Sequence, residues 1–367
     1  MLKINTIKRL QTAYYTIGKT FGKWVSPIFT GLIIIFLKLK VIFYNKLDKI
    51  IYPKKVNSRL KSPILIVGNP RSGTTFLQRF LAKNFGTGSE LWEMIFPSIL
   101  LQKFIKPILP VLEKYSPTKH HSTDAHKTSL SSVETDDAAI FFRYNDGFFL
   151  YGFILAWAEQ DLFTWFDPKH RNMSKRDFDW LSRMWSKKLY KSQKNYYFGK
   201  LFSVSANMPS FQNYFPDGKV LYMIRAPLEV IPSGLSLVTG VLEKKFGFWN
   251  QPEELKNKYL SRLYNALKEL LIRFQHDWVN NNIDKSKVKI ITFNRLMNDF
   301  DNLMFEILDF LNIEKSNEIE TLIIETANKQ KSFKSNHKYD LEKFGLNEKQ
   351  IKIDFEDIYS TFLNGDF

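Results

Sequence analysis

The feature that most constrains this chain is a glycine-rich loop that lies between an apolar run and a helical pattern. Residues 63–67 read PILIV, which is typical of a buried strand. Residues 68–75 read GNPRSGTT, and apolar residues then recur at helical spacing over residues 76–81. A strand, a glycine loop and a helix N-terminus in this order make a phosphate cradle, because backbone N–H groups and the helix dipole point at the anion. The chain is therefore predicted to be an α/β protein that binds an anion at this loop.

The loop departs in one position from the loops of kinases and nucleotide hydrolases. Its glycines and last threonine fit the frame G-x-x-x-x-G-K-[ST], but Thr74 stands in place of the lysine. In those enzymes the lysine reaches the terminal phosphates and an aspartate after a second strand supports magnesium. Here the next clear apolar strand, residues 220–224, ends in Arg225. We therefore expect fixed cations, including Arg71, and no metal. A kinase or nucleoside triphosphatase that acts on a small molecule remains the alternative.

A second segment has the features of an anion site. Residues 215–240 read FPDGKVLYMIRAPLEVIPSGLSLVTG, and Arg225 follows the predicted strand directly. Pro227 suits the first turn of a helix, on which Ser233 lies about two turns further along. An arginine can donate two parallel hydrogen bonds to a phosphate, although Arg225 in a structural ion pair is an equally good interpretation of this segment alone. Ligands gather at the carboxyl ends of strands in an open α/β sheet, so both segments are predicted to face one crevice.

Taken together, the two segments resemble those of sulfotransferases that use 3′-phosphoadenosine 5′-phosphosulfate (PAPS). PRSGTT after an apolar strand is similar to the 5′-phosphosulfate loop of that family, and FPD-strand-R-x-P-x-x-V-x-x-S is similar to its 3′-phosphate site. Residues 333–346, which read FKSNHKYDLEKFGL, resemble the family's C-terminal ending. Ala226 departs from the acidic residue that usually follows the arginine. The likeness covers residues 63–362 and is closest to bacterial-type enzymes with varied small-molecule, lipid or sugar acceptors.

The resemblance implies a fold, a donor and its binding residues. The fold would have three layers, with a central parallel sheet flanked by helices, which agrees with the alternating strand and helix patterns. The sulfuryl group would pass from PAPS to a hydroxyl or amine of the acceptor. The 5′-phosphosulfate would be held by Arg71, Ser72, Gly73, Thr74 and Thr75, and the 3′-phosphate by Arg225 and Ser233. A basic loop that either closes over the nucleotide or is plain solvated surface contains Lys334, His337 and Lys338.

Sulfuryl transfer also requires stabilisation of developing charge and a general base near the acceptor. Arg71 is the expected cation. The family often has a histidine followed eight residues later by a glutamate, and His126 and Glu134 have this spacing. The acidic residues near Glu134 would equally well suit the start of a helix. Lys200, which precedes a predicted strand over residues 201–205, is a third candidate but matches the family's L-K-S-P pattern poorly.

Residues 1–60 are predicted to form a separate basic and apolar segment, and residues 61–367 the catalytic domain. Apolar residues dominate from Trp24 to Leu37 and from Val41 to Tyr44, with lysines on both sides. The uninterrupted run is shorter than the roughly 20 residues of a membrane span. This pattern is typical both of a helix in the interface of an anionic membrane and of a helix packed on the domain surface. A linker is expected from Pro53 onward.

Composition narrows the range of partners. The net charge of +16 attracts anions, but no zinc-finger spacing or RNA-binding signature accompanies it, so nucleic acid is not expected. The absence of cysteine excludes disulfides and thiolate metal sites, and fits a cytoplasmic protein, either free or peripheral at the inner face of the membrane. The acceptor is expected to be a small molecule, lipid or carbohydrate. The 33 phenylalanines and the N-terminal segment favour a lipid or another amphipathic molecule.

Overall fold

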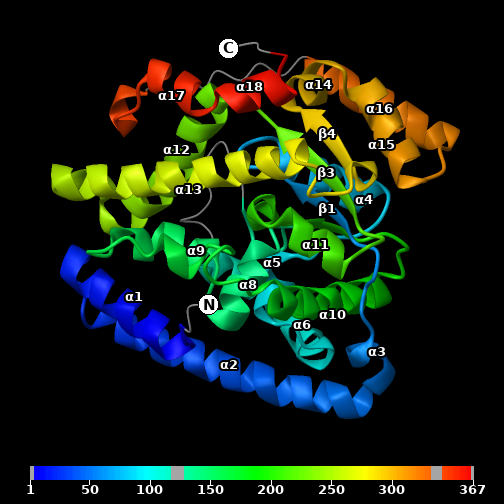
Figure 1. Ribbon diagram of the computed structural model, residues 1–367. Helices are drawn as coiled ribbons and strands as arrows, with labels where there is room; N and C mark the ends of the chain where they lie inside the picture. The colour runs from blue at the N-terminus through cyan, green and yellow to red at the C-terminus, as the bar shows by residue number, and fades with distance from the viewer. Residues whose placement is uncertain (1–3, 117–127, 332–340, 365–367) are drawn as a thin grey trace.

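A parallel sheet of four strands forms the centre of the computed structural model, which describes residues 4–116, 128–331 and 341–364 (Figure 1). The strand order is β2-β1-β3-β4, and every neighbouring pair is parallel. The strands are β1 Ile64–Val67, β2 Phe198–Lys200, β3 Lys219–Ile224 and β4 Val288–Thr292. The predicted α/β fold with a parallel sheet between helices is confirmed.

Helices surround the sheet. The longer ones are α1 Thr6–Phe21, α2 Ser26–Ile51, α4 Thr74–Asn84, α6 Ile99–Tyr115, α8 Asp137–Tyr144, α10 Ser174–Ser192, α12 Pro227–Phe246, α13 Glu253–Val279, α15 Phe300–Leu311 and α16 Asn317–Lys331. The shorter ones are α3 Pro53–Asn57, α5 Leu91–Ile95, α9 Phe148–Phe153, α11 Met208–Tyr214, α14 Phe293–Asn298, α17 Glu348–Asp354 and α18 Glu356–Phe362. Helices α1 and α2 lie along the lower edge of the molecule in Figure 1, away from the sheet.

Alternate residues of the central strands enter two separate cores, as the pleat of a strand requires. Leu65 and Tyr222 face the larger core, to which α12 and α13 contribute. Ile66 and Met223 face the smaller core, which α4, α15 and α16 close. Because both faces of the sheet are covered, the central strands β1 and β3 consist almost entirely of buried apolar residues.

Three predictions of local structure are corrected. Residues 201–205 were expected to be a strand, but the strand is β2 and ends at Lys200, and a 3₁₀ helix follows over Phe202–Ala206. The chain turns here because the buried carboxylates of Asp136 and Asp137 accept the backbone N–H groups of Lys200 and Phe202, at 3.0 Å each. The helical pattern of residues 295–311 in the sequence predicts a single helix, but the structure divides it into α14 and α15. The expected linker after Pro53 contains α3.

Buried charges attach α1 and α2 to the rest of the chain. Arg9 of α1 donates to the carbonyl oxygens of Tyr144 and Asn145 at 3.1 and 2.9 Å. Asp48 of α2 accepts hydrogen bonds from the first two N–H groups of α6, at 2.7 and 3.0 Å, and lies 3.8 Å from the Lys187 ammonium group. A carboxylate at a helix N-terminus satisfies N–H groups that have no partner within the helix. The division at residue 60 stays a prediction.

We expect Asp48→Ala to lower the free energy of unfolding by about 2–4 kcal/mol, because it leaves the α6 N-terminus without its acceptor and the Lys187 ammonium group without a counter-charge. Urea denaturation measures this change. The neighbouring exposed Lys49 provides the control, since Lys49→Ala should stay within about 0.5 kcal/mol of the wild type. Equal stability of the two variants would show that Asp48 does not anchor α2.

Candidate functional site

The loop between β1 and α4 is held in a tight turn. Gly68 and Gly73 have φ angles of +144° and +92°, and Arg71 also has a positive φ of +78°. A Cβ atom at Gly68 would collide with the carbonyl oxygen of Met223 on β3, so only glycine fits there. The Ser72 hydroxyl donates to the Asn69 carbonyl at 2.8 Å and closes the turn from within. The loop is therefore fixed before any ligand arrives.

The start of α4 suits an anion. Gly73 is its N-cap residue and offers no side chain to accept from the first backbone N–H groups of the helix. Thr74 and Thr75 follow, and both line the large cavity described below. A helix N-terminus without a side-chain cap presents donors and a positive partial charge, so the residues present fit a phosphate or phosphosulfate group.

Two hydrogen bonds connect this loop to the second predicted anion segment. The Arg225 guanidinium group donates from Nη1 to the Arg71 carbonyl oxygen at 3.0 Å, and the Arg71 side chain donates from Nε to the Ser233 Oγ at 3.1 Å. Arg225 also lies 4.1 Å above the Phe293 ring and pairs with the half-exposed Glu229. The two segments thus meet at adjacent strand ends, as the sequence predicts.

Lys200 reaches the same loop from the neighbouring strand. It is the last residue of β2, opposite Ile66 of β1, and its ammonium group donates to the Thr75 Oγ1 at 2.8 Å. Burial lowers the pKa of Lys200 below its ordinary value, although the nearby Glu134 carboxylate opposes that effect. The structure therefore places a buried cation beside the helix start, where a loop lysine is absent.

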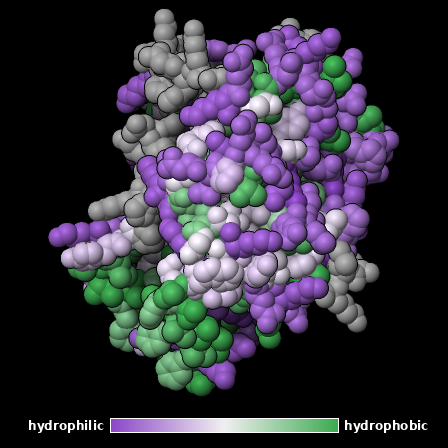
Figure 2. Space-filling model, turned by 90° about the vertical axis from the view of Figure 1, so that its left-hand side faces the viewer, coloured by the Kyte–Doolittle hydropathy of each residue, from purple (hydrophilic) through white to green (hydrophobic). Residues whose placement is uncertain are grey.

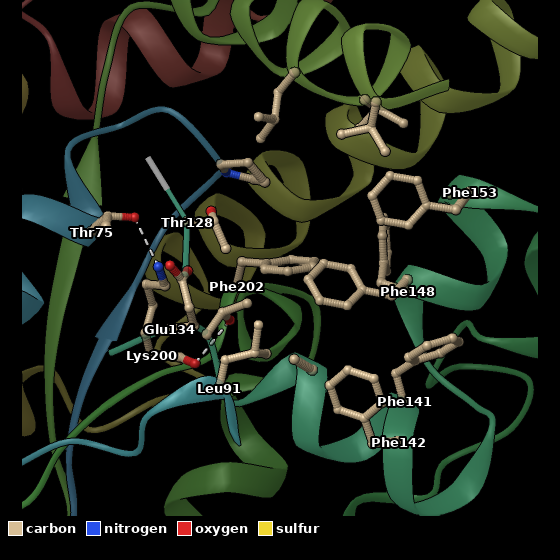
Figure 3. Close-up of a pocket in the computed structure, with 18 of the residues that line it drawn as sticks. Thr75, Leu91, Thr128, Glu134, Phe141, Phe142, Phe148, Phe153, Lys200 and Phe202 are labelled. Carbon is tan, nitrogen blue, oxygen red and sulfur yellow. Dashed lines mark hydrogen bonds between the residues drawn. The ribbon is translucent and has the colours of Figure 1, made fainter. Parts of the chain in front are cut away.

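Glu134 lies next to this cation. Its carboxylate is almost completely buried and accepts a hydrogen bond from Arg79 Nη2 at 2.6 Å. Arg79 is one turn of α4 beyond Thr75, so its side chain lies on the same side of the helix. Figure 3 shows Thr75, Lys200 and Glu134 close together at one end of the cavity.

Two further carboxylates hold the strand that bears Lys200. Asp136 accepts from the Trp185 indole at 3.1 Å, from the Tyr197 hydroxyl at 2.9 Å and from the Lys200 N–H at 3.0 Å. Asp137 accepts from the Phe202 N–H and the Thr135 hydroxyl. Burial raises the pKa of Asp136 to about 7. These residues position Lys200 and do not themselves line the cavity.

A cavity of about 2220 Å³ begins at this cluster and extends to α1 and α2. Its polar end is lined by Arg71, Thr75, Glu134, Lys200 and Arg225. Its other walls are mostly apolar, and Figure 3 shows Phe202 between the polar end and a group made of Phe141, Phe142, Phe148 and Phe153. This volume exceeds the roughly 300–1,000 Å³ of ordinary ligand pockets, so it has room for a nucleotide and a second substrate.

Most of the predicted site residues converge here. Arg71, Ser72, Gly73, Thr74, Thr75, Arg225, Ser233 and Glu134 lie around the polar end of the cavity or in the loop that forms it. The other predicted residues, His126, Lys334, His337 and Lys338, lie outside the described residues.

Sequence reasoning underestimated one residue and missed another. Lys200 was set aside because its surroundings do not fit the family pattern, and the misplaced strand hid its position at a strand end. Arg79 was not considered, although its spacing of four residues from Thr75 on a predicted helix indicates that it faces the loop.

Comparison with known proteins identifies relatives of this arrangement. Residues 63–317 match the sulfotransferase family. Sulfotransferase STF1 from Mycobacterium tuberculosis H37Rv has a similar structure, with a TM-score of 0.70 at 16% sequence identity over 95% of this chain and 90% of that one. For sulfotransferase STF9 from Mycobacterium avium the TM-score is 0.66 at 14% identity, over 87% and 81% of the two chains. At these identities the likeness concerns the fold alone. No curated protein sequence matches the chain significantly.

We expect Asp136→Asn to lower the free energy of unfolding by about 2–4 kcal/mol, because the amide nitrogen must face a buried N–H donor. Burial holds the pKa of Asp136 at about 7 in the folded protein, well above the ordinary value of an aspartate in the unfolded chain. The wild type therefore gains stability from the protonated form at low pH, and loses it as the pH rises through about 7. Asp136→Asn has no titrating group at this position. The unfolding free energy of the wild type should therefore exceed that of the variant by more at pH 5 than at pH 8.

Chemical denaturation at the two pH values measures that difference. Asp217→Asn, a change of the same kind at an exposed position, should leave the unfolding free energy within about 0.5 kcal/mol of the wild type at both. A difference for Asp136→Asn that grows from pH 5 to pH 8 would contradict the assignment.

Proposed function

Because the chain belongs to the sulfotransferase family, we propose that it transfers a sulfuryl group from PAPS to a hydroxyl or amine of a small-molecule, lipid or carbohydrate acceptor. The observation that carries the proposal is the pair of hydrogen bonds that joins the Arg71 loop to Arg225 and Ser233. A bisphosphorylated adenosine has anionic groups at two ends, and this arrangement offers a guanidinium group for each. A single crevice would therefore hold both anionic ends of the nucleotide.

The 5′-phosphosulfate would bind at the N-terminus of α4. Backbone N–H groups from Gly73 to Thr75 supply the donors there, and Arg71 and Lys200 supply positive charge. Ser72 contributes through the shape of the loop, because its hydroxyl is engaged with the Asn69 carbonyl.

The 3′-phosphate would bind between Arg225 and Ser233. Arg225 now pairs with Glu229, whose side chain is 54% exposed. An ion pair with so exposed a partner contributes little, so exchanging the carboxylate for a phosphate costs little free energy. The basic segment with Lys334, His337 and Lys338 remains a candidate cover for the nucleotide.

The chemical step needs a balanced transfer at sulfur. An acceptor oxygen or nitrogen forms a bond to sulfur, the bond from sulfur to the phosphate oxygen breaks, and the acceptor proton leaves. We assign that proton to the Glu134 carboxylate, which lies beside Lys200 at the polar end of the cavity, with His126 as the other candidate base. Lys200 and Arg71 would stabilise the charge that develops on the leaving phosphate and the transferring oxygens.

A thermal shift experiment tests nucleotide binding. Adenosine 3′,5′-bisphosphate at about 100 times its Kd should add about 2.7 kcal/mol, which for a chain of 367 residues raises Tm by about 3–4 °C. ATP with magnesium should raise Tm less. Arg225→Ala should abolish the shift, whereas Arg59→Ala, which removes an arginine from a surface ion pair with Asp179, should keep it. A larger shift with ATP and magnesium would favour a kinase or nucleoside triphosphatase instead.

Replacement of Lys200 and Glu134 should separate binding from chemistry. We expect Lys200→Ala to lower kcat by about 10²–10³-fold, because it removes a charge aimed at the transferring group. Glu134→Gln should lower kcat by about 10²–10⁴-fold, because the amide cannot accept the proton. Release of adenosine 3′,5′-bisphosphate from PAPS, with a panel of alcohols and amines, measures both. Glu134→Gln with wild-type turnover would remove Glu134 from the mechanism and direct attention to His126.

A further inference from the structure

The first half of α2 exposes apolar side chains around its whole circumference. Leu32, Ile33, Ile34, Ile35 and Phe36 are each between 38% and 60% exposed, and five consecutive residues extend around the whole circumference of a helix. Among the described residues, α2 is the one helix that is long and apolar enough to cross a membrane. A helix of a water-soluble surface would present polar residues to the solvent instead.

Helix α6 extends this apolar surface. Phe104, Ile108, Val111 and Tyr115 are exposed, and their spacings of four, three and four residues place them in one stripe along the helix. The helix packs against α2, where the rings of Tyr44 and Phe104 are 6.0 Å apart. In Figure 2 the hydrophobic side chains gather at the lower end of the molecule, at the level where Figure 1 places α2.

The orientation of α2 argues against a helix that leaves the protein and crosses a bilayer. Its second half is held along the domain by Asp48, which is fully buried between the α6 N-terminus and Lys187. The apolar first half is therefore held in place as part of the folded surface. A helix in this position can lie in the interfacial layer of a membrane with its outer face in the acyl region.

The charge of the segment indicates the kind of membrane. Asp48 is the one acidic residue among residues 1–60, and it is buried. Exposed lysines lie before, along and after α2, among them Lys23, Lys40, Lys46 and Lys49. Lysines near a bilayer surface contribute about 1 kcal/mol each when its lipids are anionic. The charge thus complements an anionic bilayer.

The cavity opens on this same surface. Residues of α2 that line it include Pro27, Gly31, Ile34 and Lys38, which recur at helical spacing and form the inner face of the helix. Phe29, Ile33 and Phe36 do not line it and form the outer face. Ile34 and Ile35 are both cavity-lining and exposed, so the wall of the cavity continues into the apolar surface.

We propose that α2 and α6 rest on an anionic bilayer and that the cavity takes its acceptor from it: a long-chain lipid whose terminal hydroxyl or amine reaches Lys200 and Glu134. This inference rests on the proposed sulfuryl transfer. The apolar walls bury the chain, while the polar end of the cavity receives the head group next to the donor site. Each buried methylene contributes about 0.8 kcal/mol, so chain length should dominate acceptor choice.

Vesicle cosedimentation tests the docking surface. The full chain should bind phosphatidylcholine vesicles that contain phosphatidylglycerol at least tenfold more tightly than pure phosphatidylcholine vesicles. The double variant Phe29→Glu, Ile33→Glu on the outer face should lose this binding at least tenfold and keep the thermal shift with adenosine 3′,5′-bisphosphate. Val279→Glu, which places a charge on an exposed apolar residue of α13, is the matched control and should bind as the wild type does. An equal loss of vesicle binding in the double variant and in Val279→Glu would overturn the docking surface. A wild-type protein that forms dimers through α2 and does not bind vesicles would overturn it as well.

Acceptor competition tests the cavity. With PAPS, a C16 alcohol in phosphatidylglycerol vesicles should have a kcat/KM at least 100-fold above that of butanol. Gly31→Phe adds a ring where a Cβ atom meets nothing within 4 Å, and should lower the ratio of C16 to butanol turnover at least tenfold. Equal turnover of the two alcohols, or an unchanged ratio in the variant, would overturn the lipid acceptor. Failure of the bisphosphate to bind would refute the proposed function, whereas normal bisphosphate binding without chain-length dependence would refute only this inference.

Discussion

The parallel pairing of β1 with β2 and β3 is the constraint on which the site depends. It brings three strand ends to one edge, so that Lys200 of β2 and Arg225 after β3 both donate hydrogen bonds to the segment that follows β1. Arg225 is more than 150 positions from Arg71 in the sequence, yet its guanidinium group donates a hydrogen bond to the backbone carbonyl oxygen of Arg71. A displacement of either strand by one residue would separate the two guanidinium groups and reverse the side of the sheet that each side chain faces.

Three acidic residues close together in sequence have separate tasks because their surroundings differ. Glu134 faces the cavity and pairs with Arg79, whereas Asp136 and Asp137 face backward and fix the end of β2. Burying so many charges is costly unless each has partners, and here indole, hydroxyl and backbone donors supply them. The desolvation of these carboxyl groups occurs where the buried Lys200 is positioned against the loop between β1 and α4.

The strands β1 and β3, the anion loop and the meeting of Arg71 with Arg225 could be predicted from the sequence, because glycine and proline positions and short apolar runs act locally. It did not reveal β2, since Phe198–Lys200 is three residues long and its end is set by carboxylates that lie more than 60 residues away in the chain. The importance of Lys200 was missed for the same reason. The sequence pattern of α2 did not decide between packing on the domain and contact with a membrane. In the structure its second half is anchored by Asp48, whereas its first half is exposed.

The left-handed backbone conformation of Arg71 has a consequence for protein engineering. A non-glycine residue at a φ of +78° costs about 1–2 kcal/mol relative to its relaxed state, yet the guanidinium group at this position connects to Ser233 and faces the cavity. Glycine would relieve the conformational penalty and delete the charge in a single step. Directed evolution for thermal stability alone would therefore favour glycine at position 71 and lower the affinity for the anionic ligand. At this one residue, stability and activity make opposite demands.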